Sequence, residues 1–210
     1  MKKLLFLFMI SLNIWALSSS EILKKVDYNM TPTTVKYDGK MVIHQGSSVL
    51  TKEMKVIAKG ADLGLIEFMS PARDKGTKFL RTDSLLYIYF PSAGKTQKLS
   101  GHMLRQGMMG SDLSYEDQTS RNKLDDIYNS KILKETDDEY TLELILKPNE
   151  ENSYYKRVIT VDKKKFVLLD SLMYANSGKL LKELSVLKYE KIKDRYYITH
   201  FKMEDKIKKD

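Results

Sequence analysis

The hydrophobic positions of this 210-residue chain repeat with a period of two over much of its length. In residues 52–59 alternate side chains are apolar, including Met54 and Val56, and residues 140–147 repeat the pattern through Leu142, Leu144 and Leu146. Such alternation predicts β-strands with one buried and one largely solvated face. The same test predicts further strands near residues 39–45, 63–69, 77–82, 84–90, 95–99, 130–135, 155–162, 166–175, 180–190 and 195–203.

Short turn sequences separate many of these strands. They occupy residues 59–62, 91–94, 148–152 and 175–178, and they are rich in Gly, Pro, Asn and Asp. Strands in close succession imply an antiparallel, up-and-down sheet. A sheet of this size has to curl. The predicted fold is therefore mainly β with α: a curled antiparallel sheet forming an incomplete half-barrel covered by helices.

Two amphipathic segments predict the covering helices. Ser19 or Ser20 can cap the first helix, and Thr31 before Pro32 ends it. The second is predicted from Ser114 to about residue 128, where Ser114 and the acidic residue three positions later resemble a capping box.

The N-terminus has the pattern of a secretory signal peptide. Two lysines precede a short apolar run, and small residues follow it at positions 16–20. A retained N-terminal anchor is the alternative, although the run is short for a membrane span. We therefore predict a signal peptide at residues 1–20 and one exported domain at residues 21–210.

Composition narrows the class of protein further. The chain has no cysteine, which excludes disulfides, thiolate metal sites and an acylated N-terminal cysteine. Its formal net charge of +8 comes from lysines interleaved with acidic residues. Nucleic-acid-binding proteins usually concentrate positive charge on one face. We expect no nucleic-acid partner, with weak, transient contact with anionic lipid headgroups as the alternative to a merely solvated surface.

No catalytic or metal-binding signature is present. His44, His102 and His200 lack the ligand spacing of metal sites. Helix capping explains Ser111 and Ser114 more simply than nucleophilic catalysis does, since no nucleophile elbow surrounds them. We therefore expect no catalytic residue, no metal and no cofactor, and an exported hydrolase has little support.

A methionine-rich stretch stands out in residues 103–117. Gly107 and Gly110 bracket Met108 and Met109, so the segment offers an adaptable apolar surface on a backbone that can hinge. The apolar strand faces could line a ligand cavity or form ordinary packed core, and periodicity leaves both alternatives open.

Three blocks resemble the outer membrane lipoprotein-sorting proteins of the LolA-like superfamily, in its larger periplasmic branch. Residues 70–80 resemble the family's proline, Gly-Thr and aromatic-leucine pattern, and residues 85–91 resemble its strand ending in Tyr-x-Pro. The most specific block is Arg-Gln-Gly-Met-Met-Gly-Ser-Asp-Leu-Ser-Tyr-Glu-Asp at 105–117. Leu113 and Gln118 depart from it, because the family often has an aromatic and a leucine there.

The resemblance implies a half-barrel with an apolar concave side, and a function without catalysis. It implies a monomeric carrier in the periplasm of a Gram-negative-type bacterium, which shields acyl chains of lipoproteins or other lipids. The alternative is an accessory or docking subunit of an inner-membrane exporter of the RND type. The expected ligand-binding residues of the cavity and its lid are Met54, Val56, Leu142, Leu144, Leu146, Met108, Met109 and Tyr115, with Gly107 and Gly110 as the hinge.

Overall fold

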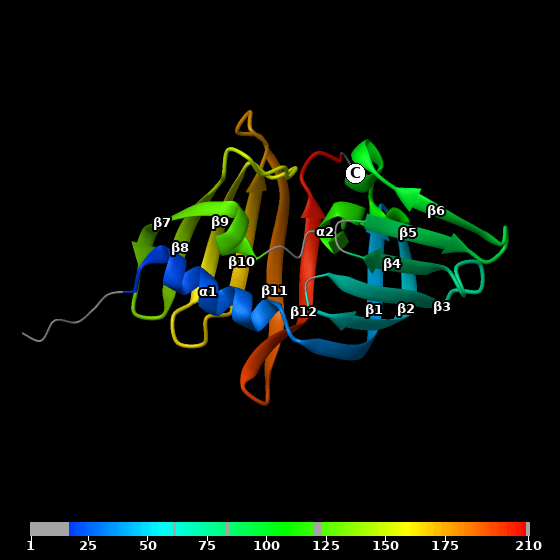
Figure 1. Cartoon of the computed structure of the whole chain (residues 1–210), viewed down its shortest axis with the longest axis horizontal. Helices are drawn as coiled ribbons and strands as arrows, with labels where there is room; N and C mark the ends of the chain where they lie inside the picture. The colour runs from blue at the N-terminus through cyan, green and yellow to red at the C-terminus, as the bar shows by residue number, and fades with distance from the viewer. Residues whose placement is uncertain (1–16, 61, 83–84, 120–122, 209–210) are drawn as a thin grey trace, which may run out of the picture.

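The computed structural model describes residues 17–60, 62–82, 85–119 and 123–208, which form two antiparallel six-stranded sheets (Figure 1). Each sheet follows the chain order strand by strand, as the short turns predict. The first sheet contains β1 (Thr34–Gln45), β2 (Ser48–Lys59), β3 (Leu63–Ser70), β4 (Lys78–Thr82), β5 (Leu85–Phe90) and β6 (Lys95–Leu99). The second contains β7 (Tyr128–Glu135), β8 (Glu139–Leu146), β9 (Lys156–Asp162), β10 (Leu168–Tyr174), β11 (Leu180–Ile192) and β12 (Arg195–Asp205).

The second sheet packs its concave face against α1 (Ser19–Met30), which lies across the strands in Figure 1. Ile22, Leu23 and Val26 of this helix are fully buried against Leu142 and Leu144 of β8. Ser18 caps the helix, one position before the predicted Ser19 or Ser20. The cap is reciprocal, because Ser18 accepts from the backbone of Glu21 while the Glu21 carboxylate accepts from Ser18.

The first sheet has a separate core beneath the methionine-rich segment. Phe68 and Phe79 are buried at its centre, with their rings edge to face at 5.3 Å. The segment covering them contains two 3-10 helices, η1 (Gly101–Arg105) and η2 (Met108–Gly110), and the short helix α2 (Tyr115–Thr119). Met108 is buried in this core, and Tyr115 packs its ring on Phe79.

The helix predicted from Ser114 to residue 128 is two short helices instead. After α2, a separate α3 (Leu124–Ile127) precedes β7, which already begins at Tyr128. The two helices belong to different cores: Tyr115 packs on the first sheet, whereas Leu124 and Ile127 pack beneath α1 on the second. The intervening sequence is polar throughout, so no apolar face holds one continuous helix together.

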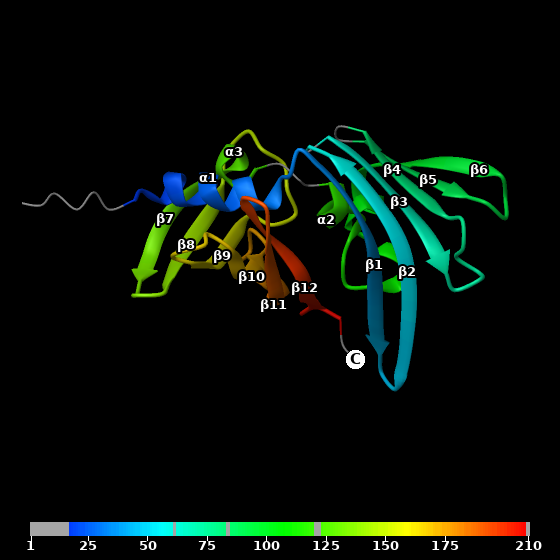
Figure 2. The same ribbon diagram turned by 90° about the horizontal axis from the view of Figure 1, so that it is seen from below.

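The predicted fold class is confirmed, with one difference in architecture. We expected a single curled sheet, but pairing is interrupted between β6 and β7. Of the described residues between these strands, the apolar side chains of 103–115 pack on the first sheet, and Leu124 and Ile127 pack on the second. The first and last strands of the fold, β1 and β12, therefore become the inner edges of two adjacent sheets (Figure 2). Of the described helices, none is long and apolar enough to cross a membrane. Most of the predicted signal peptide lies outside the described residues.

Candidate functional site

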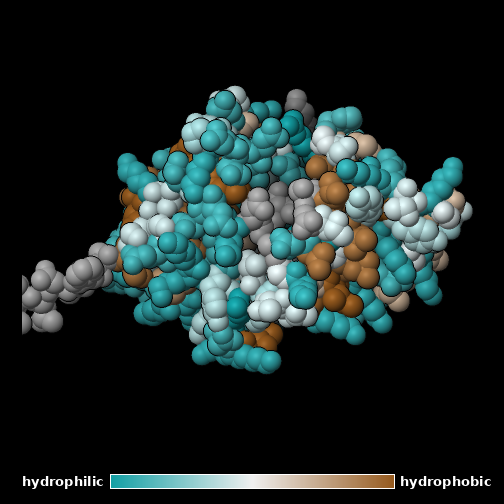
Figure 3. Space-filling view, in the orientation of Figure 1, coloured by the Kyte–Doolittle hydropathy of each residue, from teal (hydrophilic) through white to brown (hydrophobic). Residues whose placement is uncertain are grey.

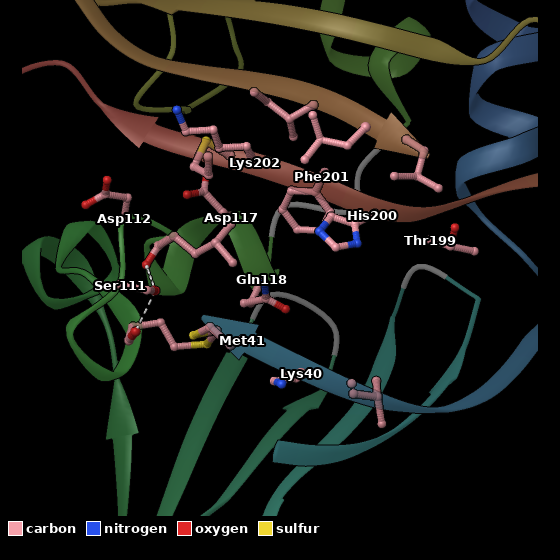
Figure 4. A pocket seen from close by; sticks show the side chains of 18 of the residues that line it. Lys40, Met41, Ser111, Asp112, Asp117, Gln118, Thr199, His200, Phe201 and Lys202 are labelled. Atoms are coloured by element: carbon pink, nitrogen blue, oxygen red, sulfur yellow. Dashed lines mark hydrogen bonds between the residues drawn. The ribbon is translucent and has the colours of Figure 1, made fainter. Parts of the chain in front are cut away.

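A large cleft separates the inner edges of the two sheets. It has a volume of about 2230 Å³, and β1 and β12 form its two sides. Figure 4 shows these strands on opposite sides of the opening, with Met41 on β1 and with His200 and Phe201 on β12. Ordinary small-molecule pockets measure about 300–1,000 Å³. The cleft therefore has room for a ligand larger than a typical metabolite.

The floor of the cleft is apolar and both sheets contribute to it. Met54, Val56 and Ile66 come from the first sheet, and Leu168, Leu184 and Ile198 come from the second. Large apolar side chains also remain exposed around the opening, although Figure 3 shows a surface that is mostly hydrophilic on the face in view. These exposed lining residues are Met30, Tyr37, Val42, Leu187, Ile192 and Phe201. An apolar ligand could therefore contact the protein from the opening down to the floor.

Residues 107–119, the bridging segment, connect the two sheets at one end of the cleft. Its apolar side chains pack on the first sheet, while Asp117 faces the second. The Asp117 carboxylate accepts a hydrogen bond at 2.7 Å from Lys182 Nζ of β11 and another at 2.6 Å from the Tyr154 hydroxyl. It also completes the predicted capping box, because it accepts from Ser114 N at 2.8 Å while Asp117 N donates to Ser114 Oγ at 3.2 Å. One side chain thus caps α2 and joins the sheets.

A second polar connection ties the bridging segment to the end of β12. Lys208 Nζ lies 2.7 Å from Asp112 Oδ1, and the backbone N–H of Asp205 donates to Asp112 Oδ2 at 3.1 Å. On the other side, Gln45 Nε2 at the end of β1 donates to Gly110 O at 3.0 Å. The segment therefore holds the ends of both inner strands.

The two aspartates of the bridging segment are held in their ionised forms. Burial opposes ionisation of Asp117, but the charge and hydrogen bond of Lys182 and the donors Tyr154 and Ser114 outweigh it, so its pKa is lowered. Burial likewise opposes ionisation of Asp112, and the Lys208 ammonium together with the Asp205 N–H lowers its pKa. Both carboxylates are thus committed to structural partners and are not free to act as a general base.

Several other polar groups of the cleft are hydrogen-bonded within the protein or lie on opposite sides of the cleft. Arg157 donates to Ser171 Oγ at 3.1–3.2 Å. His44 and His200 line opposite sides, whereas His102 lies in η1. Ser111 Oγ donates to the Met108 carbonyl at 2.7 Å. Across the described residues, no group of three His, Asp or Glu side chains is arranged to hold a metal ion.

The structure divides the residues predicted to bind ligand into three groups. Met54, Val56 and Met108 border the cleft and are largely buried. Met109 and Tyr115 pack partly buried against the core of the first sheet. Leu142, Leu144 and Leu146 belong to the core beneath α1 and do not border the cleft. Contact of any of them with a ligand stays a prediction.

The predicted hinge residues occupy a tight turn. Gly107 forms an antiparallel bridge with Ser114, and Met108 N donates to Leu113 O at 2.6 Å. Gly110 has a φ of +85°, which favours glycine. A hinge motion at these residues stays a prediction.

The cleft-lining residues of β1 and β12 have no distinctive sequence pattern. Met41, Ile198 and Phe201 border the cleft, but they were not among the residues predicted to bind ligand. A β-bulge at Thr199 also interrupts the alternation of β12. The apolar residues that these two strands leave exposed are Tyr37, Val42 and Phe201, which is too weak a pattern to mark a site in the sequence.

Comparison with known proteins supports the fold and the family. A protein-family model described as an uncharacterized protein matches residues 60–210. No curated protein sequence matches the chain.

Three crystal structures have the same fold over most of the chain. A DUF1329 family protein from Desulfovibrio piger has a TM-score of 0.81 and 28% sequence identity, over 89% of this chain and 84% of that one. A protein domain from Vibrio parahaemolyticus, described as outer membrane lipoprotein-sorting, has a TM-score of 0.76 and 23% identity, over 90% and 85%. A LolA superfamily protein from Nitrosomonas europaea has a TM-score of 0.72 and 23% identity, over 91% and 87%. The fold implied by the resemblance in residues 70–117 is confirmed.

Proposed function

The chain belongs to the family whose model matches residues 60–210, and it shares the fold of the LolA superfamily of outer membrane lipoprotein-sorting proteins. From this premise we propose that it is a periplasmic carrier. It binds the acyl chains of lipoproteins or lipids in the cleft between its sheets, and the predicted signal peptide at residues 1–20 exports it.

The observation that carries this proposal is the set of apolar side chains that both sheets contribute to the cleft, between charged residues such as Lys40 and Lys202. Val56 and Ile198 represent its floor, while Phe201 and Leu187 remain exposed at the opening. Each methylene group transferred from water into such a lining contributes about 0.8 kcal/mol. An acyl chain of ordinary length can therefore be held without any directional polar contact.

A binding measurement on the purified exported protein tests the proposal. We expect native mass spectrometry to detect co-purified lipid and a fluorescent fatty acid to bind the delipidated protein. Phe201→Glu places a charge at the opening and should weaken binding of this probe by about tenfold, a change of about 1.4 kcal/mol. Leu80→Glu is the matched control, because Leu80 and Phe201 are each 43% exposed but Leu80 lies on β4, outside the cleft. If the protein purifies without lipid and does not bind the fatty acid, the carrier function is refuted.

One observation favours the alternative role as an accessory subunit of an inner-membrane exporter. Ile57, Leu65 and Leu80 are paired neighbours across β2, β3 and β4, and their side chains share a face that is not covered by the described helices. Ile57 and Leu80 are exposed, and exposed apolar patches often mark protein contacts. Leu80→Glu should abolish co-purification with a membrane transporter if this role is correct, and Phe201→Glu should leave it intact.

A further inference from the structure

The two inner edge strands run in the same direction on opposite sides of the cleft (Figure 2). Near their starts, Arg195 Nη1 donates to Thr31 O at 3.0 Å, and β1 begins three residues later at Thr34. Near their ends, the bridging segment holds Gln45 of β1 and Asp205 of β12. Between these anchors, β1 pairs only with β2 and β12 pairs only with β11 among the described strands.

The inner and outer edges of the two sheets differ in how well they are protected. Long free edges are templates for an added strand, and proteins usually shorten, bulge or cover them. The outer strand β6 has five residues, and the outer strand β7 has a bulge near Leu133 and a carbonyl, Ser130 O, that accepts from Ser19 Oγ. The inner strands have 12 and 11 residues and contain no proline.

Of the two inner strands, β1 offers the more regular edge. Its register with β2 is unbroken from Thr34 to Gln45, whereas the pairing of β12 with β11 shifts on either side of Lys188. An added strand needs evenly spaced backbone donors and acceptors, so β1 is the better template.

The hydrogen bonds of the β1–β2 hairpin identify which backbone groups of β1 are free. Gly60 N donates to Thr33 O at 2.9 Å, so this pair is hydrogen-bonded, and the two-residue turn after Gln45 closes on another such pair. Hydrogen-bonded and non-bonded pairs alternate along an antiparallel ladder. The N–H and C=O groups that point away from β2, towards the cleft, therefore belong to Thr34, Lys36, Asp38, Lys40, Val42 and His44.

We propose that the free edge of β1 binds an extended segment of polypeptide as an added strand, and that this segment is the stretch next to the acylated residue of a lipoprotein cargo. The proposal rests on the carrier function. The cleft places both parts of such a ligand together, because the free backbone groups of β1 border the opening while Met54 and Val56 lie on its apolar floor. Main-chain hydrogen bonds give affinity that does not depend on side chains. One carrier can thus accept cargo segments of different sequence, and it distinguishes them from a free fatty acid.

Proline substitution at a free position tests the added strand. The Lys40 N–H points to the cleft, so Lys40→Pro removes one donor from the edge and leaves the ladder with β2 in place. Lys40→Ala is the matched control, because it removes the side chain and keeps the N–H. Two probes with the same acyl chain are compared: a free fatty acid and a polar, extended peptide acylated at its N-terminus.

We expect wild-type protein and Lys40→Ala to bind the acylated peptide at least tenfold more tightly than the fatty acid. Lys40→Pro should lose most of this advantage while its affinity for the fatty acid is unchanged. Equal affinity of the wild type for the two probes, or equal loss in Lys40→Pro and Lys40→Ala, would overturn the added strand. If the fatty acid itself fails to bind the wild type, the carrier function fails instead.

Hydrogen exchange provides a readout that does not require the proline variant to fold. The acylated peptide should slow exchange of the Lys36, Asp38, Lys40, Val42 and His44 amides at least tenfold in wild-type protein, whereas the fatty acid should leave them unchanged. Protection of the β12 amides alone, or of neither strand, would contradict binding at β1.

Discussion

Lys182 and Asp117 form a buried ion pair that joins the second sheet to the segment covering the first. The Lys182 ammonium lies 2.7 Å from Asp117 Oδ2, and both side chains are only 10% exposed. The pair sits at one end of the cleft, where Asp117 is among the lining residues. The bridging segment is therefore attached to the second sheet by a contact whose own desolvation is costly.

Removing the lysine of this pair should destabilise the protein strongly. Lys182→Met leaves a buried carboxylate without its counter-charge, and we expect the free energy of unfolding to fall by about 3–5 kcal/mol. Lys206→Met is the control, because its partners Glu183 and Glu204 are partly exposed, and such pairs contribute about 0–1 kcal/mol. Urea denaturation of both variants measures the two losses in the free energy of unfolding. Equal losses would show that the buried pair contributes no more to stability than the exposed one.

The Asp117 contact also predicts an acid-dependent stability. Its pKa is lowered in the folded protein, so the contribution is complete above the unfolded pKa of about 3.9 and is lost as pH falls through the lower folded pKa. The stability difference between wild type and Asp117→Asn should therefore be constant from pH 7 to pH 5 and shrink below about pH 4. Denaturation midpoints at pH 7, 5 and 3 measure it. Burial raises the pKa of Asp27, so the pH dependence of either protein alone also contains the titration of Asp27. The difference between the two proteins removes that contribution and isolates Asp117.

Local sequence signals predict the elements of this fold well and its long-range contacts poorly. The capping box between Ser114 and Asp117 can be predicted from the sequence because the two residues are only three positions apart, and the structure contains it. The partners of the same carboxylate, Tyr154 and Lys182, lie 37 and 65 residues away and have no local signature. Strand alternation similarly identifies each strand but does not say where pairing stops.

The location of the cleft depends on where strand pairing stops, which the alternation does not predict. Leu142 and Leu144 have the cleanest alternation in the chain. The apolar face that they form is covered by the apolar side of α1, so they lie in the core beneath this helix. Met41 and Phe201 border the cleft because the sheet divides between β6 and β7. This division depends on which core each side chain between β6 and β7 packs on, and no short segment specifies that.

Gly107 should be intolerant of any side chain. A Cβ atom there would lie 2.4 Å from the Ser111 carbonyl oxygen, closer than real contacts allow. We expect Gly107→Ala to unfold at clearly lower temperature and to expose Met108 to oxidation. Gly46→Ala is the control, since Gly46 has a φ of +53° but open space around it and should lose only about 1 kcal/mol. If Gly107→Ala melts no lower than this control, the close approach to Ser111 is not restrictive.

Lys52 and Asp74 should show a strong double-mutant coupling. Lys52 is 2% exposed, and its ammonium contacts the Asp74 carboxylate in the turn between β3 and β4. Asp74→Ala leaves a buried charge unpaired and should cost about 3–5 kcal/mol, whereas adding Lys52→Met to it should restore much of the loss. Chemical denaturation of the two single variants and the double variant measures the coupling. Additive losses would mean that the two charges do not depend on each other.

The start of α1 predicts how the N-terminal boundary of the domain affects stability. Ser18 and Glu21 form the reciprocal cap, and Ser19 and Ser20 of the same turn donate to Ser130 O at 2.9 Å and to Asp125 Oδ1 at 2.7 Å. A chain that begins at Glu21, as the predicted signal peptide would leave it, lacks all three serines. We expect it to be less stable than a chain that begins at Ser18 by at least the 0.5–2 kcal/mol typical of a lost cap. Ser18→Ala in the longer chain should reproduce only the part of this stability loss that comes from the cap. Urea denaturation of the three proteins measures these differences, and equal stability of the two chain lengths would show that the serines contribute nothing to the fold.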